Sequence, residues 1–92
     1  MESVSNSALE AARAKLAEAE AKRETLLLRH IANGVNIASR TVEIDEGVVI
    51  APGATILAGT ILRGKTVIGA GCVIGPNSLI EDSTVDEGTT VN

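Results

Sequence analysis

Few side chains in this 92-residue chain could take part in chemistry, and the single histidine, His30, is the first of them. Histidine titrates near neutral pH and can act as a general base toward an attacking hydroxyl or amine. His30 lies near the end of a helical sequence, however, where a cation is stabilised by the helix dipole. A structural role is therefore expected. Three copies of His30 on the axis of a trimer could bind zinc, but one histidine per chain makes a poor ligand set, and we assign no metal site.

The single cysteine, Cys72, is a second possible reactive group. A cysteine nucleophile needs a base beside it, and no histidine is near Cys72 in the sequence. Cys72 belongs to a six-residue repeat, at a position that small residues occupy, so we expect it to pack as a small apolar group. One cysteine cannot form an internal disulfide, which fits a reducing compartment.

Arg63 and Lys65 are the two basic residues inside that repeat. Stacking of the repeats predicts that acids surround them, namely Asp45, Glu46, Glu81 and Asp82. One interpretation is a ladder of charges on the surface, which would contribute little stability per pair. The alternative is a contact to an anion or a phosphate group. We favour the ladder. No catalytic, cofactor-binding or metal-binding residue is assigned, and no cofactor is implied by the residues themselves.

A long helix must precede these groups. Residues 8–32 contain neither glycine nor proline and are rich in strong helix formers. Ser7 and Glu10 have the spacing of a capping box, and Asn33-Gly34 is a stop signal. The acid of Glu18 lies four residues before Lys22, which is the favourable order for an ion pair on a helix.

The apolar side of this helix is thin at first and thicker at its end. Leu9, Ala12, Leu16 and Ala19 give way to Leu26–Leu28 and Ile31. The heptad is short and is interrupted at Arg23, which argues against a self-sufficient coiled coil. Two alternatives remain open: the leucine-rich end packs on the next part of the chain, or a solvated helix is attached only at its C-terminal end.

The six-residue repeat begins after the helix. Aliphatic residues recur every six positions, with one step of five before Val85; they are Ile44, Ile50, Ile56, Leu62, Ile68, Ile74, Ile80, Val85 and Val91. Four residues after an aliphatic come Val48, Ala54, Thr60, Thr66, Cys72, Ser78, Thr84 and Thr89. Turn formers occupy the positions between: Gly47, Pro52, Gly53, Gly59, Gly64, Gly71, Pro76, Asn77 and Gly88. Each unit thus predicts a short strand and a corner.

Three such units close a triangular coil, and stacked coils pair their strands in parallel. The predicted columns are Ile44–Leu62–Ile80, Ile50–Ile68–Val85 and Ile56–Ile74–Val91. Large and small residues would alternate in a prism that is too narrow for aromatic rings. This explains why aromatic residues make up 0% of a chain that is 45% hydrophobic.

Composition also excludes some partners. The net charge is −4 and aromatic residues are absent, so the chain has neither the basic surface nor the stacking side chains that nucleic-acid binding uses. No secretory signal and no membrane-spanning run is visible, which predicts a cytoplasmic protein.

The repeat resembles the hexapeptide repeat of left-handed parallel β-helix proteins, which are mostly acyltransferases. Three segments carry a closer resemblance: residues 29–35 (RHIANGV), 61–69 (ILRGKTVIG) and 72–78 (CVIGPNS). They are similar to the bifunctional UDP-N-acetylglucosamine pyrophosphorylase and glucosamine-1-phosphate N-acetyltransferase family. Residues 7–92 match its linker helix and the first coils of its β-helix. The left-handedness is taken from the resemblance, because right-handed crossovers are the general rule.

The resemblance implies a mainly β chain with one long N-terminal helix over residues 1–34 and a left-handed β-helix of about two and two-thirds coils over residues 35–92. It also implies a homotrimer, with acetyl-CoA and a sugar phosphate as ligands. The sequence departs from the family in three ways. No nucleotidyltransferase domain is present, residues 35–41 look shortened, and the chain stops at Asn92 before the family's catalytic histidine. No catalytic residue is carried over, and the isolated chain is expected to be inactive. The alternative is a non-catalytic homotrimeric scaffold.

Overall fold

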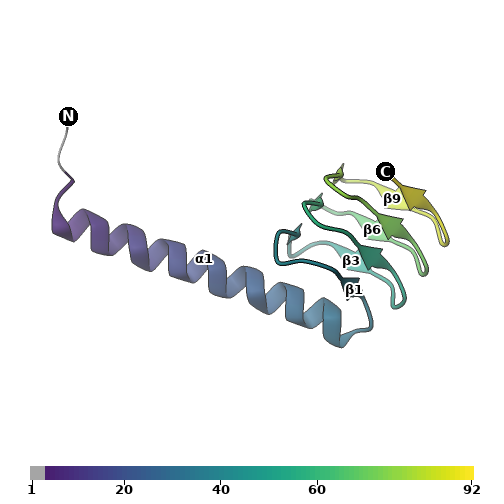
Figure 1. Cartoon of the computed structure of the whole chain (residues 1–92), viewed down its shortest axis with the longest axis horizontal. Coiled ribbons are helices and arrows are strands. Elements are labelled where there is room, and N and C mark those ends of the chain that lie inside the picture. Colours follow the sequence, from purple (N-terminus) through teal and green to yellow (C-terminus); the bar gives the residue numbers. More distant parts are fainter. Residues whose placement is uncertain (1–3) are drawn as a thin grey trace.

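The computed structural model describes residues 4–92, which form one long helix followed by a stack of short strands (Figure 1). The helix α1 spans Asn6–Ala32. The ten strands are β1 (Asn36–Ile37), β2 (Glu43–Ile44), β3 (Val49–Ile50), β4 (Thr55–Ile56), β5 (Ile61–Arg63), β6 (Val67–Ile68), β7 (Val73–Ile74), β8 (Leu79–Glu81), β9 (Thr84–Val85) and β10 (Thr90–Val91).

The start of α1 differs from the predicted capping box. Ser5, not Ser7, is the N-cap: it has extended backbone angles, and its hydroxyl accepts a hydrogen bond from the backbone N–H of Ala8 at 3.2 Å. Both serines can cap a helix, and the earlier one gains a further half-turn of backbone hydrogen bonds. Ser7 is consequently inside the helix. The predicted end is confirmed, because Asn33 closes the helix and Gly34 follows with φ of 92°.

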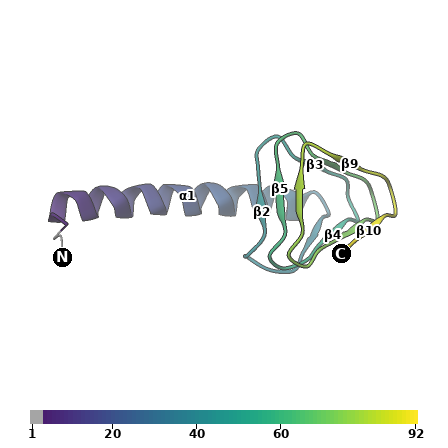
Figure 2. The same cartoon turned by 90° about the horizontal axis from the view of Figure 1, so that it is seen from above.

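Within residues 4–92, most of α1 is exposed and lies away from the coils. The helix packs against β1 and β2 through its last turns, where Leu26 and Leu27 are buried. Leu28 and Ile31 remain exposed. The first of the two sequence-based alternatives is confirmed at the leucine-rich end, where Leu26 and Leu27 pack on the first coil. The rest of α1 is solvated, as the second alternative described, and it extends away from the coils in Figures 1 and 2.

The strands form three parallel sheets, one on each side of a three-sided coil of about three turns (Figure 2). Their orders are β1-β4-β7-β10, β2-β5-β8 and β3-β6-β9. The register confirms all three predicted columns: Ile44↔Leu62↔Ile80, Ile50↔Ile68↔Val85 and Ile56↔Ile74↔Val91. The predicted fold class is therefore confirmed. The structure also contains β1, which was not predicted. Its Ile37 pairs with Ile56 and so extends the Ile56–Ile74–Val91 column by one turn.

The interior of the coil is filled by the repeat itself. The column aliphatics from Ile44 to Ile80 are buried, and so are the small residues Ala54, Thr60, Thr66 and Cys72, which have 0% exposure. Val85 and Val91, in the last turn, are partly buried. One assignment was wrong. Thr84 pairs with Val67 at an outward position, and Ser83 occupies the register position next to Thr66. The repeat unit between Ile80 and Val85 is one residue shorter than the others. The missing residue belongs to the corner before Ser83, so strand β9 keeps its full length.

The corners depend on backbone conformations that glycine and asparagine tolerate. Gly59 has φ of 74°, and a Cβ added there would collide with the side chain of Asn77 one coil above. Asn77 itself has φ of 55°. The stacked corners thus lie so close together that the side chain of Asn77 in one coil requires glycine at position 59 in the coil before it.

Within residues 4–92, the structure has no helix that is both long enough and apolar enough to cross a membrane. Helix α1 has sufficient length, but charged residues recur along the whole of it.

Candidate functional site

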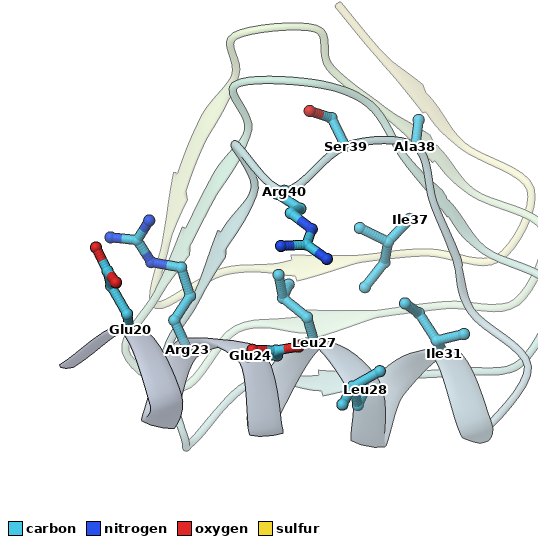
Figure 3. Close-up of a pocket in the computed structure, with 10 residues that line it drawn as sticks. All are labelled: Glu20, Arg23, Glu24, Leu27, Leu28, Ile31, Ile37, Ala38, Ser39 and Arg40. Carbon is cyan, nitrogen blue, oxygen red and sulfur yellow. The ribbon is translucent and has the colours of Figure 1, made fainter. Parts of the chain in front are cut away.

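An open groove lies where α1 meets the first coil, with a volume of about 640 Å³ (Figure 3). Its apolar walls are Leu27, Leu28 and Ile31 on the helix and Ile37 on the first coil. Its charged rim consists of Glu20, Arg23, Glu24 and Arg40. We refer to it as the helix–coil groove. Because acids and bases are balanced on the rim, the groove has no strong preference for an anion or a cation.

Two ion pairs fix the helix on the first coil. Lys22 Nζ lies 2.8 Å from Glu46 Oε1, and Arg23 Nη2 lies 3.3 Å from Glu43 Oε1. The hydrogen bond and charge of Glu46 raise the pKa of Lys22, and Lys22 correspondingly lowers the pKa of Glu46. The predicted partner of Lys22 on the helix, Glu18, is replaced by Glu46 on the coil. All four side chains are exposed, so each pair adds little to stability.

His30 lies at the end of α1, outside the coils. It is partly buried and borders a second hollow of about 450 Å³ with Arg29, Asn33 and Val49. Burial, followed by the neighbouring charge of Arg29, lowers the pKa of the imidazole. The ring is thus uncharged at neutral pH, and the expected benefit from a charged histidine at the helix end is absent. The backbone carbonyl of His30 accepts hydrogen bonds from the N–H groups of Asn33 and Val35 at the end of the helix.

Cys72 is fully buried in the coil interior. Its thiol donates a hydrogen bond to the carbonyl oxygen of Asp86 at 2.9 Å. The predicted inward position of Cys72 in the repeat is confirmed, and burial keeps its thiol away from solvent.

Arg63 and Lys65 lie beside the predicted acids, but the acids are engaged elsewhere. Asp45 Oδ2 accepts from the backbone N–H of Gly64 at 3.0 Å, and Asp82 Oδ1 accepts from that of Lys65 at 2.8 Å. Across residues 4–92, the ion pairs are those of Lys22 and Arg23. A ladder of direct ion pairs was therefore a wrong prediction. Aspartate at a turn often binds nearby backbone N–H groups, and this signal was available in the sequence.

The described residues provide no metal site. No group of three or more histidine, cysteine, aspartate or glutamate side chains among them could hold a metal ion. Among the described residues, one buried polar side-chain atom has no hydrogen-bond partner, and this atom is Thr60 Oγ1 in the interior of the coil.

Comparison with known proteins identifies the coil. Residues 47–82 match the family model described as bacterial transferase hexapeptide, six repeats. No curated protein matches the chain significantly. The matched residues include the middle member of each buried column, namely Leu62, Ile68 and Ile74. The residues that stack in the coil are therefore among those that the family model matches. Residues 47–82 are thus similar to the hexapeptide repeats of bacterial transferases, and they lie in a solenoid of parallel β-strands.

Proposed function

We propose that this chain forms the helix and first coils of an acetyl-CoA-dependent N-acetyltransferase that acts on an amino-sugar phosphate in UDP-N-acetylglucosamine synthesis. The observation that carries the proposal is the hexapeptide match over residues 47–82 within a coil whose buried columns are in perfect register. The long helix that enters the first coil at Gly34 supports it, since the bifunctional family it resembles joins a linker helix to its coils in this way.

Acetyl transfer to an amine needs a base that accepts the amine proton while the amine attacks the thioester carbonyl. Under this proposal, residues 4–92 do not provide that base. Its single histidine, His30, lies at the end of α1, outside the coils, and Cys72 is buried. The proposed role of the helix and coils is therefore structural support for the transferase, and we expect the isolated chain to have no turnover of its own.

A homotrimer is part of the proposal. Exposed aliphatic side chains point outward from two of the three sheets: Leu79 from β8, and Val49 and Val67 from β3 and β6. Outward residues of the third sheet are more polar, such as Asn36, Thr55 and Thr90. Packing between copies would bury the aliphatic faces and leave the polar face in water. This observation also supports the second candidate, a non-catalytic trimeric scaffold.

Calorimetric titration with acetyl-CoA separates the two candidates, alongside a turnover assay with acetyl-CoA and glucosamine-1-phosphate. The transferase proposal predicts that the chain, joined to the remaining coils of such an enzyme, supports turnover, whereas the chain alone gives none. Turnover by the chain alone would show that another residue acts as base. Failure of the joined protein to bind acetyl-CoA, with its trimer intact by light scattering, would favour the scaffold.

A further inference from the structure

The free part of α1 is an unusual helix, because residues 6–25 are all exposed. Most of the stability of helices in proteins comes from packing of one apolar face, and this part of α1 has no such packing on the coils. Two leucines in this part have no cover: Leu9 is 42% exposed and Leu16 is 61% exposed. Burial of Leu9 and Leu16 against a partner would therefore stabilise this part of α1.

These leucines share one side of α1 with a regular set of charges. Leu9, Arg13, Leu16, Glu20 and Leu27 succeed one another at spacings of four, three, four and seven residues, which place them in one row. We call this row the leucine row. It continues into the helix–coil groove, because Glu20 and Leu27 also line that groove (Figure 3). A single surface thus runs from the start of α1 to the first coil.

The groove end of this surface is apolar and open. Leu28 is 56% exposed and Ile31 is 48% exposed, and both face the space between α1 and the first coil. That space is bounded on its other side by Ile37 and the segment up to Arg40. The residues of α1 that line the groove run from Glu20 to Ile31, so a second helix lying alongside α1 would reach the Glu20 end of the groove.

We propose that the leucine row binds the leucine row of a second copy of this chain, with the two α1 helices antiparallel. When the pair is centred between Leu16 and Ala17, the two Leu16 side chains meet at the two-fold axis. Arg13 of each copy then lies opposite Glu20 of the other. Leu9 of each copy lies over the turn that begins at Glu24, at the mouth of the partner's groove.

Charge selects this arrangement over a parallel one. In a parallel pair in register, Arg13 would face Arg13 of the other copy, and Glu20 would face Glu20. Like charges opposite one another on packed helices are repulsive, whereas the antiparallel pair forms two Arg–Glu contacts at once. The contact is isologous, so it closes as a dimer of helices. It depends neither on the proposed transferase function nor on trimer formation by the coils.

Charge exchange tests the pairing. Glu20→Arg should weaken self-association by about tenfold or more, because it places Arg opposite Arg at two positions. Arg13→Glu should do the same, and the double variant Arg13→Glu/Glu20→Arg should restore association. Glu18→Arg makes the same charge change on the opposite side of α1 and serves as the control. The measurement is the dissociation constant from sedimentation equilibrium. Failure of the double variant to recover association would overturn the proposal.

Cross-linking tests the register. Leu16→Cys places a thiol at the two-fold axis and should give a covalent dimer on mild oxidation, while Ala11→Cys, on the opposite side of α1, should not. Cys72 is buried and does not compete in the folded protein. The expected native mass is that of two copies, or of six where the coils also form trimers. A monomer or a simple trimer, with equal cross-linking of the two cysteine variants, contradicts the helix pair.

Discussion

The hydroxyl of Thr66 donates a hydrogen bond to the carbonyl oxygen of Arg63 across 2.7 Å inside the coil. Thr66 Oγ1 also lies 3.4 Å from the backbone N–H of Ser83. Thr60 has the equivalent inward position one unit earlier and is equally buried, yet its hydroxyl has no partner among the described residues. The same residue type at the same repeat position is therefore satisfied in one unit and unsatisfied in the preceding one.

This difference predicts opposite effects of one substitution. Thr60→Val should raise the free energy of unfolding by about 0.5–1 kcal/mol, because a buried hydroxyl without a partner is replaced by a methyl group of similar size. Thr66→Val should lower it by about 1–2 kcal/mol, because the carbonyl oxygen of Arg63 loses one of its two donors and the N–H of Ser83 loses the Thr66 hydroxyl as acceptor. Urea denaturation followed by far-UV circular dichroism measures both. Equal changes in the two variants would show that Thr60 also has a partner.

The middle turn of the coil should be the most sensitive to truncation. Leu62 is fully buried between Ile44 and Ile80, and Leu62→Ala should cost about 2–5 kcal/mol through lost burial and the remaining cavity. Leu79→Ala is the matched control, since Leu79 is 59% exposed on an adjacent strand. Its cost to a monomer should stay below about 1 kcal/mol. A comparable shift of the thermal midpoint in the two variants would contradict the inward–outward alternation.

Two glycines with the same backbone angle should respond differently to alanine. Gly59 and Gly71 have φ of 74° and 70°. A Cβ at Gly71 meets no atom within 4 Å, so Gly71→Ala carries only the cost of a left-handed alanine, about 1–2 kcal/mol. A Cβ at Gly59 collides with Asn77, so Gly59→Ala should cost more. The double variant Gly59→Ala/Asn77→Gly should recover the excess if the collision is its cause. Chemical denaturation measures all three variants.

Stability should depend on pH near neutrality through His30. Burial holds the pKa of the folded imidazole below the ordinary value of 6.5, so the unfolded chain binds the proton more readily. The contribution of His30 is complete above pH 6.5 and is lost as the pH falls toward the folded pKa. Glu46 also has a lowered pKa, but the stability it adds is lost only below its ordinary value of 4.5. Thermal midpoints measured from pH 5 to pH 8 should flatten in His30→Gln. An unchanged slope in that variant would assign the dependence to other groups.

The coil was largely predictable from sequence because its physics is local and repeats. Every sixth residue must be aliphatic to fill the prism, and a corner must come next, so the columns from Ile44 to Val91 could be aligned by counting. Counting failed where the period changed. A five-residue step does not say which part of the unit is shortened, and the register placed the shortening in the corner before Ser83.

The helix ends were less predictable, since Ser5 and Ser7 are both able to cap and the choice depends on the backbone before them. The partners of Lys22 and Arg23 could not be found from spacing along the helix, because Glu46 and Glu43 reach them only after the chain has turned back over the first coil. Likewise, the carboxylates of Asp45 and Asp82 are drawn to backbone N–H groups one coil away.

Sequence alone therefore determined the three-sided coil, its buried columns and the lack of aromatic residues, because each results from side-chain volume repeated at a fixed period. Tertiary structure decided what the charges do and where α1 lies. Ion pairs and hydrogen bonds between coils depend on distances across the stack, which no local pattern encodes. The groove beside α1 exists for the same reason: Leu27 and Ile37 are ten residues apart in the chain and meet only when the helix is laid against the first coil.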